Sequence, residues 1–320
     1  MFIEKARQTW SGKVIPVEVG ATPENGGTRS HVLTIGGAET LPFLKFEGQT
    51  GFPPALAMEV WDTKPPEWSS VLSGAFGDVL DDPLAWAQFA LQHGADAVCL
   101  RLAGSHPDLK DTAIAESIRL VKSFLGAVQA PLIILGSGHI EKDRELLPAI
   151  CEAAAGERCL VGPAVAENYR TIAAACMAFG HSLIAESPID VNLAKQLNIL
   201  CVDAGLPKER IVMHHLSSAL GYGLEYTYSI MERARLAGLK GDPMLSQPML
   251  SITGPDVWKT REATLPEAEM PEWGALEKRG INWEAVTSIA LLQAGADLLI
   301  LTHPQALEIV KEAIAEDRFS

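Results

Sequence analysis

The chain has 320 residues, of which 40 are acidic and 26 basic, so its formal charge is −14, and 48% of its positions are hydrophobic. This composition is typical of a globular protein, and the length allows either two ordinary domains or one large α/β barrel. The negative charge argues against nucleic acid as a partner, and the apolar stretches are much shorter than the roughly 20 residues that cross a membrane.

The N-terminal part of the chain contains two features. The first ten residues lack the apolar core of a signal peptide, and we therefore expect a cytoplasmic protein. Within residues 13–37, two apolar runs at 13–19 and 31–35 flank a turn-rich stretch at 21–27. This pattern predicts an N-terminal β-hairpin, which would most simply plug one end of a barrel.

From residue 55 onward, short apolar runs alternate with helical patterns eight times. The expected strands are 55–61, 95–102, 131–135, 159–162, 181–186, 211–215, 248–253 and 297–302. The expected helices lie near 83–93, 111–127, 142–155, 167–179, 190–204, 222–239, 281–294 and 304–316. Eight successive βα units predict an α/β protein with a (β/α)₈ TIM barrel as a single domain over residues 1–320. The rival open sheet would need a Gly-rich phosphate turn, which the sequence lacks.

Residues 254–280 interrupt this regular alternation. They form a long excursion, rich in Pro, Glu and Gly, between the seventh strand and its helix. Long loops in compact domains are usually functional or interfacial. We therefore expect this loop to contribute to a site or to a contact with a partner.

The number and spacing of the cysteines limit which metal sites the chain could form. The chain has five cysteines and no C-x-x-C spacing; they are Cys99, Cys151, Cys159, Cys176 and Cys201. This pattern contains neither a disulfide framework nor a complete ligand set for zinc or an iron–sulfur cluster. We expect small buried side chains in a reducing compartment and no iron–sulfur cluster held by this chain.

Barrel chemistry takes place at the carboxyl ends of the strands. The polar or flexible residues expected there are Glu59, Asp62, Arg101, Ser137, Gly138, His139, Gly162, Glu186, Ser187, His214, His215, Thr253, Thr302 and His303. Glu59 and Arg101 follow small residues on the same strand faces, so both should point into the barrel, either as a structural ion pair or toward a ligand. His214 and His215 are adjacent on a strand and point to opposite faces, which argues against a shared metal ion.

No known catalytic signature accompanies these residues. The sequence has no G-x-S-x-G, no H-E-x-x-H and no phosphate-binding P-loop, and no expected strand contains a lysine that could form a Schiff base. The residues alone therefore predict a barrel whose mouth binds something that the chain does not transform by an evident route.

Three longer strings resemble a known family. They are Gly20-Ala21-Thr22 with Gly26-Gly27-Thr28-Arg29-Ser30-His31, then Leu220-Gly221-Tyr222-Gly223-Leu224-Glu225-Tyr226 with Ser229-Ile230-Met231-Glu232-Arg233, and Trp283-Glu284-Ala285 before Leu291-Leu292-Gln293-Ala294-Gly295-Ala296. From about residue 13 to 315 the chain resembles the small (delta) subunits of corrinoid iron–sulfur proteins. That family works in the acetyl-CoA decarbonylase/synthase system of the reductive acetyl-CoA (Wood–Ljungdahl) pathway of carbon fixation.

The resemblance implies a non-catalytic subunit of a heterodimer. The large corrinoid iron–sulfur subunit would carry the [4Fe–4S] cluster and most of the cobamide (cobalamin-type, cobalt-containing) site, and this barrel mouth would cover the corrin at the subunit interface. The cobamide would receive a methyl group from methyltetrahydrofolate on a separate methyltransferase and pass it to acetyl-CoA synthase. The chain has no D-x-H-x-x-G cobalamin motif, as such a division of labour requires.

The candidate cofactor-binding residues are those at the mouth: Glu59, Arg101, His214, His215, Gly221, Tyr222 and Gly223. His214-His215 stands where the family tends to have Asp-Pro. Gly221 and Gly223 would either let the backbone approach a flat ligand, with Tyr222 lying against it, or only shape the entry to the next helix.

Two other functions fit the same fold. A free-standing pterin-binding barrel methyltransferase is the main alternative, since related methyltransferases share the fold. Asp62 lies near a strand end, as a pterin site would require, but no strand-end Asn accompanies it. A barrel lyase or aldolase has only the fold in its favour.

Overall fold

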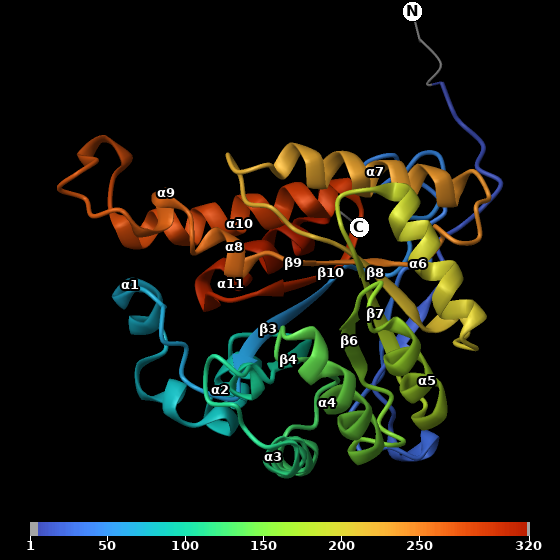
Figure 1. The fold of residues 1–320 in the computed structure, drawn as a ribbon. Helices are drawn as coiled ribbons and strands as arrows, with labels where there is room; N and C mark the ends of the chain where they lie inside the picture. Colours follow the sequence, from blue (N-terminus) through green and yellow to red (C-terminus); the bar gives the residue numbers. More distant parts are fainter. Residues whose placement is uncertain (1–5, 319–320) are drawn as a thin grey trace, which may run out of the picture.

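The computed structural model describes residues 6–318, so the two extreme ends of the expected 1–320 domain lie outside the described residues. Eight parallel strands close into a barrel in the order β10-β3-β4-β5-β6-β7-β8-β9, with helices around it (Figure 1). The strands are β3 (Ala55–Trp61), β4 (Ala97–Arg101), β5 (Leu132–Leu135), β6 (Leu160–Ala164), β7 (Ser182–Ser187), β8 (Ile211–His215), β9 (Met249–Ile252) and β10 (Ala296–Leu301). The predicted TIM barrel is confirmed.

The helices that follow the strands lie close to their predicted positions. They are α2 (Pro83–Gln92), α3 (Ile114–Ala127), α4 (Ile140–Ala153), α5 (Tyr169–Phe179), α6 (Val191–Asp203), α7 (Leu224–Leu239), α10 (Leu276–Ala294) and α11 (Pro304–Ala313). Several begin at side-chain caps: Asp82 accepts from the amides of Leu84 and Ala85 at the start of α2. None of the helices within residues 6–318 is long and apolar enough to cross a membrane.

The strands are apolar on both faces, as a barrel covered by helices requires. A separate apolar cluster fills the interior, with Ala57 of β3 and Cys99 of β4 among its members. The alternate side chains, such as Met58 and Val98, pack outward in the cluster that includes the helices. The prediction that the small-residue faces of β3 and β4 look into the barrel is therefore confirmed.

All five cysteines are free and buried. Apart from Cys99, they belong to the outer cluster between strands and helices. Burial raises the pKa of the Cys159 and Cys201 thiols to about 12, so these thiols are neutral. Their predicted role as small buried side chains is confirmed.

The N-terminal hairpin consists of β1 (Val17–Val19) and β2 (Leu33–Ile35), which pair antiparallel across a turn containing η1 (Pro23–Asn25). Val17, Val19 and Ile35 join the apolar cluster inside the barrel. The amide of Gly20 donates to the carbonyl of Arg158, just before β6 begins. The hairpin therefore plugs the barrel, as predicted, and it does so at the amino-terminal ends of the strands.

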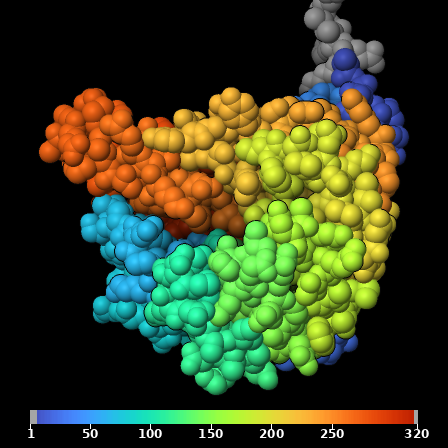
Figure 2. Space-filling view, in the orientation of Figure 1, coloured from blue at the N-terminus to red at the C-terminus, as the bar shows by residue number. Residues whose placement is uncertain are grey.

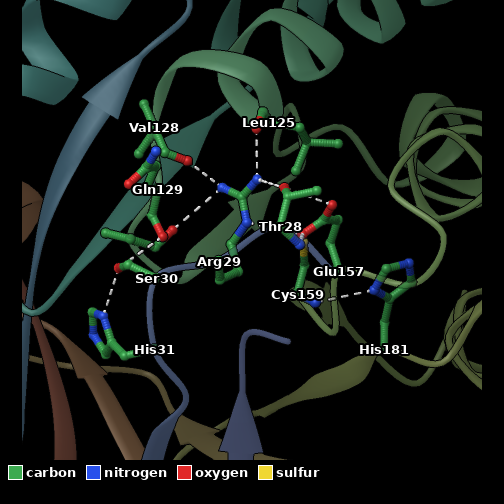
Figure 3. A network of polar contacts seen from close by, with 11 residues as sticks. Thr28, Arg29, Ser30, His31, Leu125, Val128, Gln129, Glu157, Cys159 and His181 are labelled. Atoms are coloured by element: carbon green, nitrogen blue, oxygen red, sulfur yellow. Dashed lines mark hydrogen bonds and ion pairs between the residues drawn. The ribbon is translucent and has the colours of Figure 1, made fainter. Parts of the chain in front are cut away.

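Arg29 fastens this plug (Figure 3). Its buried guanidinium donates to Glu157 Oε2 at 2.9 Å, to the carbonyl of Leu125 at 2.6 Å and to the carbonyl of Val128. Thr28 adds two further bonds to Glu157, from its amide and its hydroxyl. The first family-like string thus has a structural role at the end of the barrel that is opposite the mouth.

The predicted loop 254–280 contains more helix than its composition suggested. It includes α8 (Gly254–Val257), α9 (Arg261–Thr264) and η5 (Pro271–Trp273), and α10 begins at Leu276 instead of 281. Gly280, which looked like the end of the loop, lies inside α10, where a Cβ atom would come within 2.4 Å of the Trp258 ring. We call residues 254–280 the arm; Figure 1 shows that it projects beyond the barrel.

A second projecting segment faces the arm. Residues 62–82 contain α1 (Ser70–Gly74) and η2 (Gly77–Asp81) and follow the end of β3. Figure 2 shows a recess between the blue lobe formed by this segment and the orange lobe formed by the arm. Both segments follow carboxyl ends of strands, so the recess lies at the barrel mouth.

Candidate functional site

Four ionisable side chains lie at the carboxyl ends of the strands and face the interior. They are Glu59 of β3, Arg101 of β4, Glu186 of β7 and His214 of β8, each two residues after an interior apolar side chain. Charged groups at this depth are unfavourable unless they pair. We call these four residues the mouth cluster.

Glu59 and Arg101 form an ion pair, in which Arg101 Nε donates to Glu59 Oε1. The β3–β4 register places Arg101 beside Trp61, and the guanidinium lies 5.9 Å from the centre of the Trp61 ring. Burial favours the neutral guanidine, but Glu59 raises the pKa of Arg101 above its ordinary value. The structural ion pair expected from the strand alternation is therefore present.

Glu186 and His214 form the second pair. His214 Nδ1 lies 2.9 Å from Glu186 Oε2, and His214 Nε2 lies 3.5 Å from Ser217 Oγ. Burial alone would raise the pKa of Glu186, but the hydrogen bond and electrostatic interaction with His214, together with the charge of Arg101, outweigh burial and lower the pKa. Ser217 Oγ also accepts from the amide of Ile252 at 3.2 Å, so this hydroxyl is already engaged. The arrangement therefore orients Glu186 and His214 as a carboxylate–imidazole pair that can hold a proton, and it does not activate Ser217 as a nucleophile.

His215 lies apart from the mouth cluster. It shares the face of β8 with Ile211 and Met213, which pack outward toward the helices. Burial, with a smaller effect of His214, lowers the pKa of His215 to about 3, so its imidazole is neutral. As expected from strand geometry, the two histidines do not converge. Within residues 6–318, no three or more His, Cys, Asp or Glu side chains are grouped so that they could hold a metal ion.

The Gly221-Tyr222-Gly223 loop leads into α7. Gly221 and Gly223 have φ angles of 77° and 104°, which are strained for other residues, and Gly223 caps α7. Tyr222 is 48% exposed, and its hydroxyl accepts from the amide of Arg261 in the arm at 3.3 Å. The loop thus shapes the helix entry and contacts the arm, while about half of the Tyr222 side chain stays open to a ligand or partner.

The recess between the two lobes is a cavity of about 470 Å³. Its lining includes Trp61 at the end of β3, Trp68 of the 62–82 segment, Trp258 of the arm and Thr302, which directly follows β10. The sequence reasoning missed this cavity, although tryptophans following the first and seventh barrel strands were a usable signal. Asp62 does not line it: its Oδ1 accepts from the amide of Gly104 at 2.7 Å, and burial raises its pKa to about 6.

Apolar side chains are exposed on the opposite side of the mouth. Ile140, Leu193 and Leu216 line a second hollow of about 400 Å³ that also includes Glu186. Tyr222 and Tyr226 are exposed on the neighbouring loop and the first turn of α7. We call these five residues the apolar rim. Contiguous exposed apolar side chains are typical of surfaces that meet a partner or ligand.

Solved structures share the fold of this chain. Dihydropteroate synthase from Xanthomonas albilineans with 4-aminobenzoic acid has a TM-score of 0.59 at 14% identity, over 94% of this chain and 97% of that chain. The enzyme from Coxiella burnetii in complex with pteroic acid has a TM-score of 0.57 at 10% identity, over 95% and 100%. At such low identity the likeness establishes the barrel fold alone.

Relatives in sequence are more informative. The profile of the family described as CO dehydrogenase/acetyl-CoA synthase delta subunit matches residues 17–312. The acetyl-CoA decarbonylase/synthase complex subunit delta of Archaeoglobus fulgidus is 38% identical over 97% of this chain and 69% of that protein. Its counterpart in Methanopyrus kandleri is 37% identical over 95% and 75%. The chain therefore belongs to the delta-subunit family of the acetyl-CoA decarbonylase/synthase complex.

Proposed function

We propose that this chain is the non-catalytic barrel subunit of a cytoplasmic heterodimeric methyl carrier. Its partner is a large corrinoid iron–sulfur subunit that holds a cobamide, and the barrel mouth covers that cofactor. The heterodimer carries methyl groups from methyltetrahydrofolate:corrinoid methyltransferase to acetyl-CoA synthase. Membership of the delta-subunit family over nearly the whole chain is the observation that carries this proposal.

The distribution of exposed side chains supports the mouth as the covering surface. The apolar rim lies at the carboxyl ends of the strands, beside the mouth cluster. The opposite end is closed by the hairpin and by the buried Arg29–Glu157 pair. A barrel with one end closed and one open end bordered by exposed apolar side chains suits a subunit that meets a large flat ligand held by a partner.

The mouth residues fit a corrin in chemistry. A corrin is a broad ring bordered by amide side chains, so it needs apolar contact together with a few hydrogen-bonding groups. The apolar rim offers the contact, and the partly exposed Arg101 guanidinium and the Tyr222 hydroxyl offer polar groups. His214 is engaged with Glu186 and is nearly fully buried, so it is not placed as a free ligand for cobalt. When bound, the cobamide supplies the methyl-accepting metal; this chain orients it and excludes water.

Co-expression with the large subunit, with no tag on this chain, tests the proposal. We expect a one-to-one complex that carries corrinoid absorbance and iron, while the chain purified alone carries neither. Methyl transfer from methyltetrahydrofolate to cobinamide by the isolated chain, without any partner, would support the free-standing pterin-binding methyltransferase instead. Matched assays with the methyltransferase and with acetyl-CoA synthase then distinguish a carrier from an enzyme.

A further inference from the structure

Glu284, in the middle of α10, is a fully buried carboxylate that gathers three N–H donors. The indole Nε1 of Trp258 donates to it at 2.7 Å, the amide of Thr302 at 2.5 Å and the amide of His303 at 3.1 Å. Trp258 belongs to the arm, whereas Thr302 and His303 directly follow β10. One side chain therefore joins the arm to the carboxyl end of a barrel strand.

Trp258 is held from two further directions. Its ring lies against Gly280 of α10, where any side chain would collide with it, because a Cβ atom would come within 2.4 Å. The imidazole of His303 stacks on it, with ring centres 5.4 Å apart and planes 19° apart. The same indole lines the 470 Å³ mouth cavity, together with Trp61 and Trp68. The position of Trp258 thus fixes one wall of the cavity.

We propose that Glu284 is the positioning residue of the mouth cavity: through Trp258 it holds the cavity wall, and through Thr302 and His303 it ties the arm to β10. Glu284 does not line the cavity, so it acts on a ligand only through these three residues. The inference concerns this chain by itself and goes beyond the proposed covering of a cobamide.

The environment of Glu284 makes its hydrogen bonds with the three N–H donors sensitive to pH. The pKa of Glu284 is raised to about 7, mainly because the carboxyl group is buried. The three N–H donors lower this pKa, and the negative charge of Glu59, on strand β3, raises it further. Protonation removes the negative charge that strengthens these bonds, so the hydrogen bonds from the three N–H donors weaken. Burial lowers the pKa of His303 to about 4, which keeps that ring neutral in the same range. Asp256 and Lys259 are the charged residues beside Trp258 on its own segment.

Fluorine NMR of the full chain labelled with 5-fluorotryptophan tests the inference. Trp258 is assigned by its loss in Trp258→Phe. We expect its resonance to shift with a midpoint near pH 7 in the parent protein and to lose this shift in Glu284→Gln. Trp283 is the matched control, because its indole donates to the carbonyl of Leu220, which does not titrate. A Trp258 resonance that is constant between pH 5.5 and 8.5, or that titrates equally in Glu284→Gln, overturns the inference.

Hydrogen exchange supplies a second readout. In Glu284→Gln the amides of Thr302 and His303 should exchange roughly tenfold faster, the effect of one lost charge-assisted hydrogen bond. If Glu284→Gln does not fold, Trp258→Phe serves instead: it removes one donor to the carboxylate, so the pH midpoint of exchange at Thr302 and His303 should move upward. An unmoved midpoint contradicts the inference. These readouts need no corrinoid. A negative result therefore contradicts only the role of Glu284, and a failure of the proposed methyl-carrier function would leave that role unaffected.

Discussion

Glu186 and His214 lie directly opposite each other in the register of β7 and β8, with Glu186 Oε2 2.9 Å from His214 Nδ1. Each follows an interior apolar residue, Ile184 or Val212, by one strand repeat. Parallel strands in register therefore bring together two side chains that are 28 residues apart in the sequence. The result is an oriented pair at the edge of the barrel mouth.

This pair should make stability depend on pH in the acid range. Against the raising effect of burial, His214 and Arg101 together lower the pKa of Glu186 below its ordinary value of 4.5. The ionised carboxylate therefore contributes stability above about pH 4.5, and this stability is lost as the pH falls through the lower folded value. His214→Ala should reduce the free energy of unfolding at pH 7 by about 1–3 kcal/mol, because a largely buried carboxylate loses its partner. Urea unfolding at pH 3 and 7 measures this, and an equal loss at both values would contradict it.

The Glu59–Arg101 ion pair should behave as one unit. Arg101→Met leaves the Glu59 carboxylate buried without its partner, which typically costs about 3–5 kcal/mol. Adding Glu59→Gln should recover part of that loss, because the stranded charge is removed. A double-mutant cycle of unfolding free energies measures the coupling, and strictly additive losses would show that the two residues do not act as a pair.

The hairpin plug should depend on Arg29. Arg29→Met leaves Glu157 without its guanidinium partner, so we expect a loss of about 3–5 kcal/mol and faster hydrogen exchange in β1 and β2. Arg158→Met is the control, because its pair with Glu18 is much more exposed than the Arg29–Glu157 pair and should be worth less than about 1 kcal/mol. Equal losses for the two variants would mean that the Arg29 network does not fasten the hairpin.

Substitution of Tyr222 tests whether the Gly221-Tyr222-Gly223 loop contacts the cofactor. Tyr222→Ala should leave stability nearly unchanged, since about half of the side chain is exposed, yet alter the corrinoid absorbance or the methyl-transfer rate of the assembled heterodimer. Phe43→Ala, which removes a similarly exposed aromatic ring from the segment that follows β2, is the control. Unchanged spectra and unchanged transfer to both partners would remove the loop from the site.

The sequence by itself determined the architecture and one element of the site. The alternation of apolar runs with helical patterns predicted the barrel, because the periodicity that marks a strand or a helix extends over only a few neighbouring residues. The two-residue repeat of a strand also sufficed to place Glu59 and Arg101 on inward faces of adjacent strands, and the structure has them paired. The separation of His214 from His215 follows from the same repeat.

Only the tertiary structure decided the rest of the mouth. The cavity combines Trp61 and Trp68 with Trp258, nearly 200 residues away, and the carboxylate that holds Trp258 comes from a third segment. Gly280 looked like a loop residue, yet it lies within α10, where only a glycine leaves room for the Trp258 ring. Local periodicity carries no information on such contacts: they arise when barrel closure brings distant strand ends together, and the packing there selects which side chains meet.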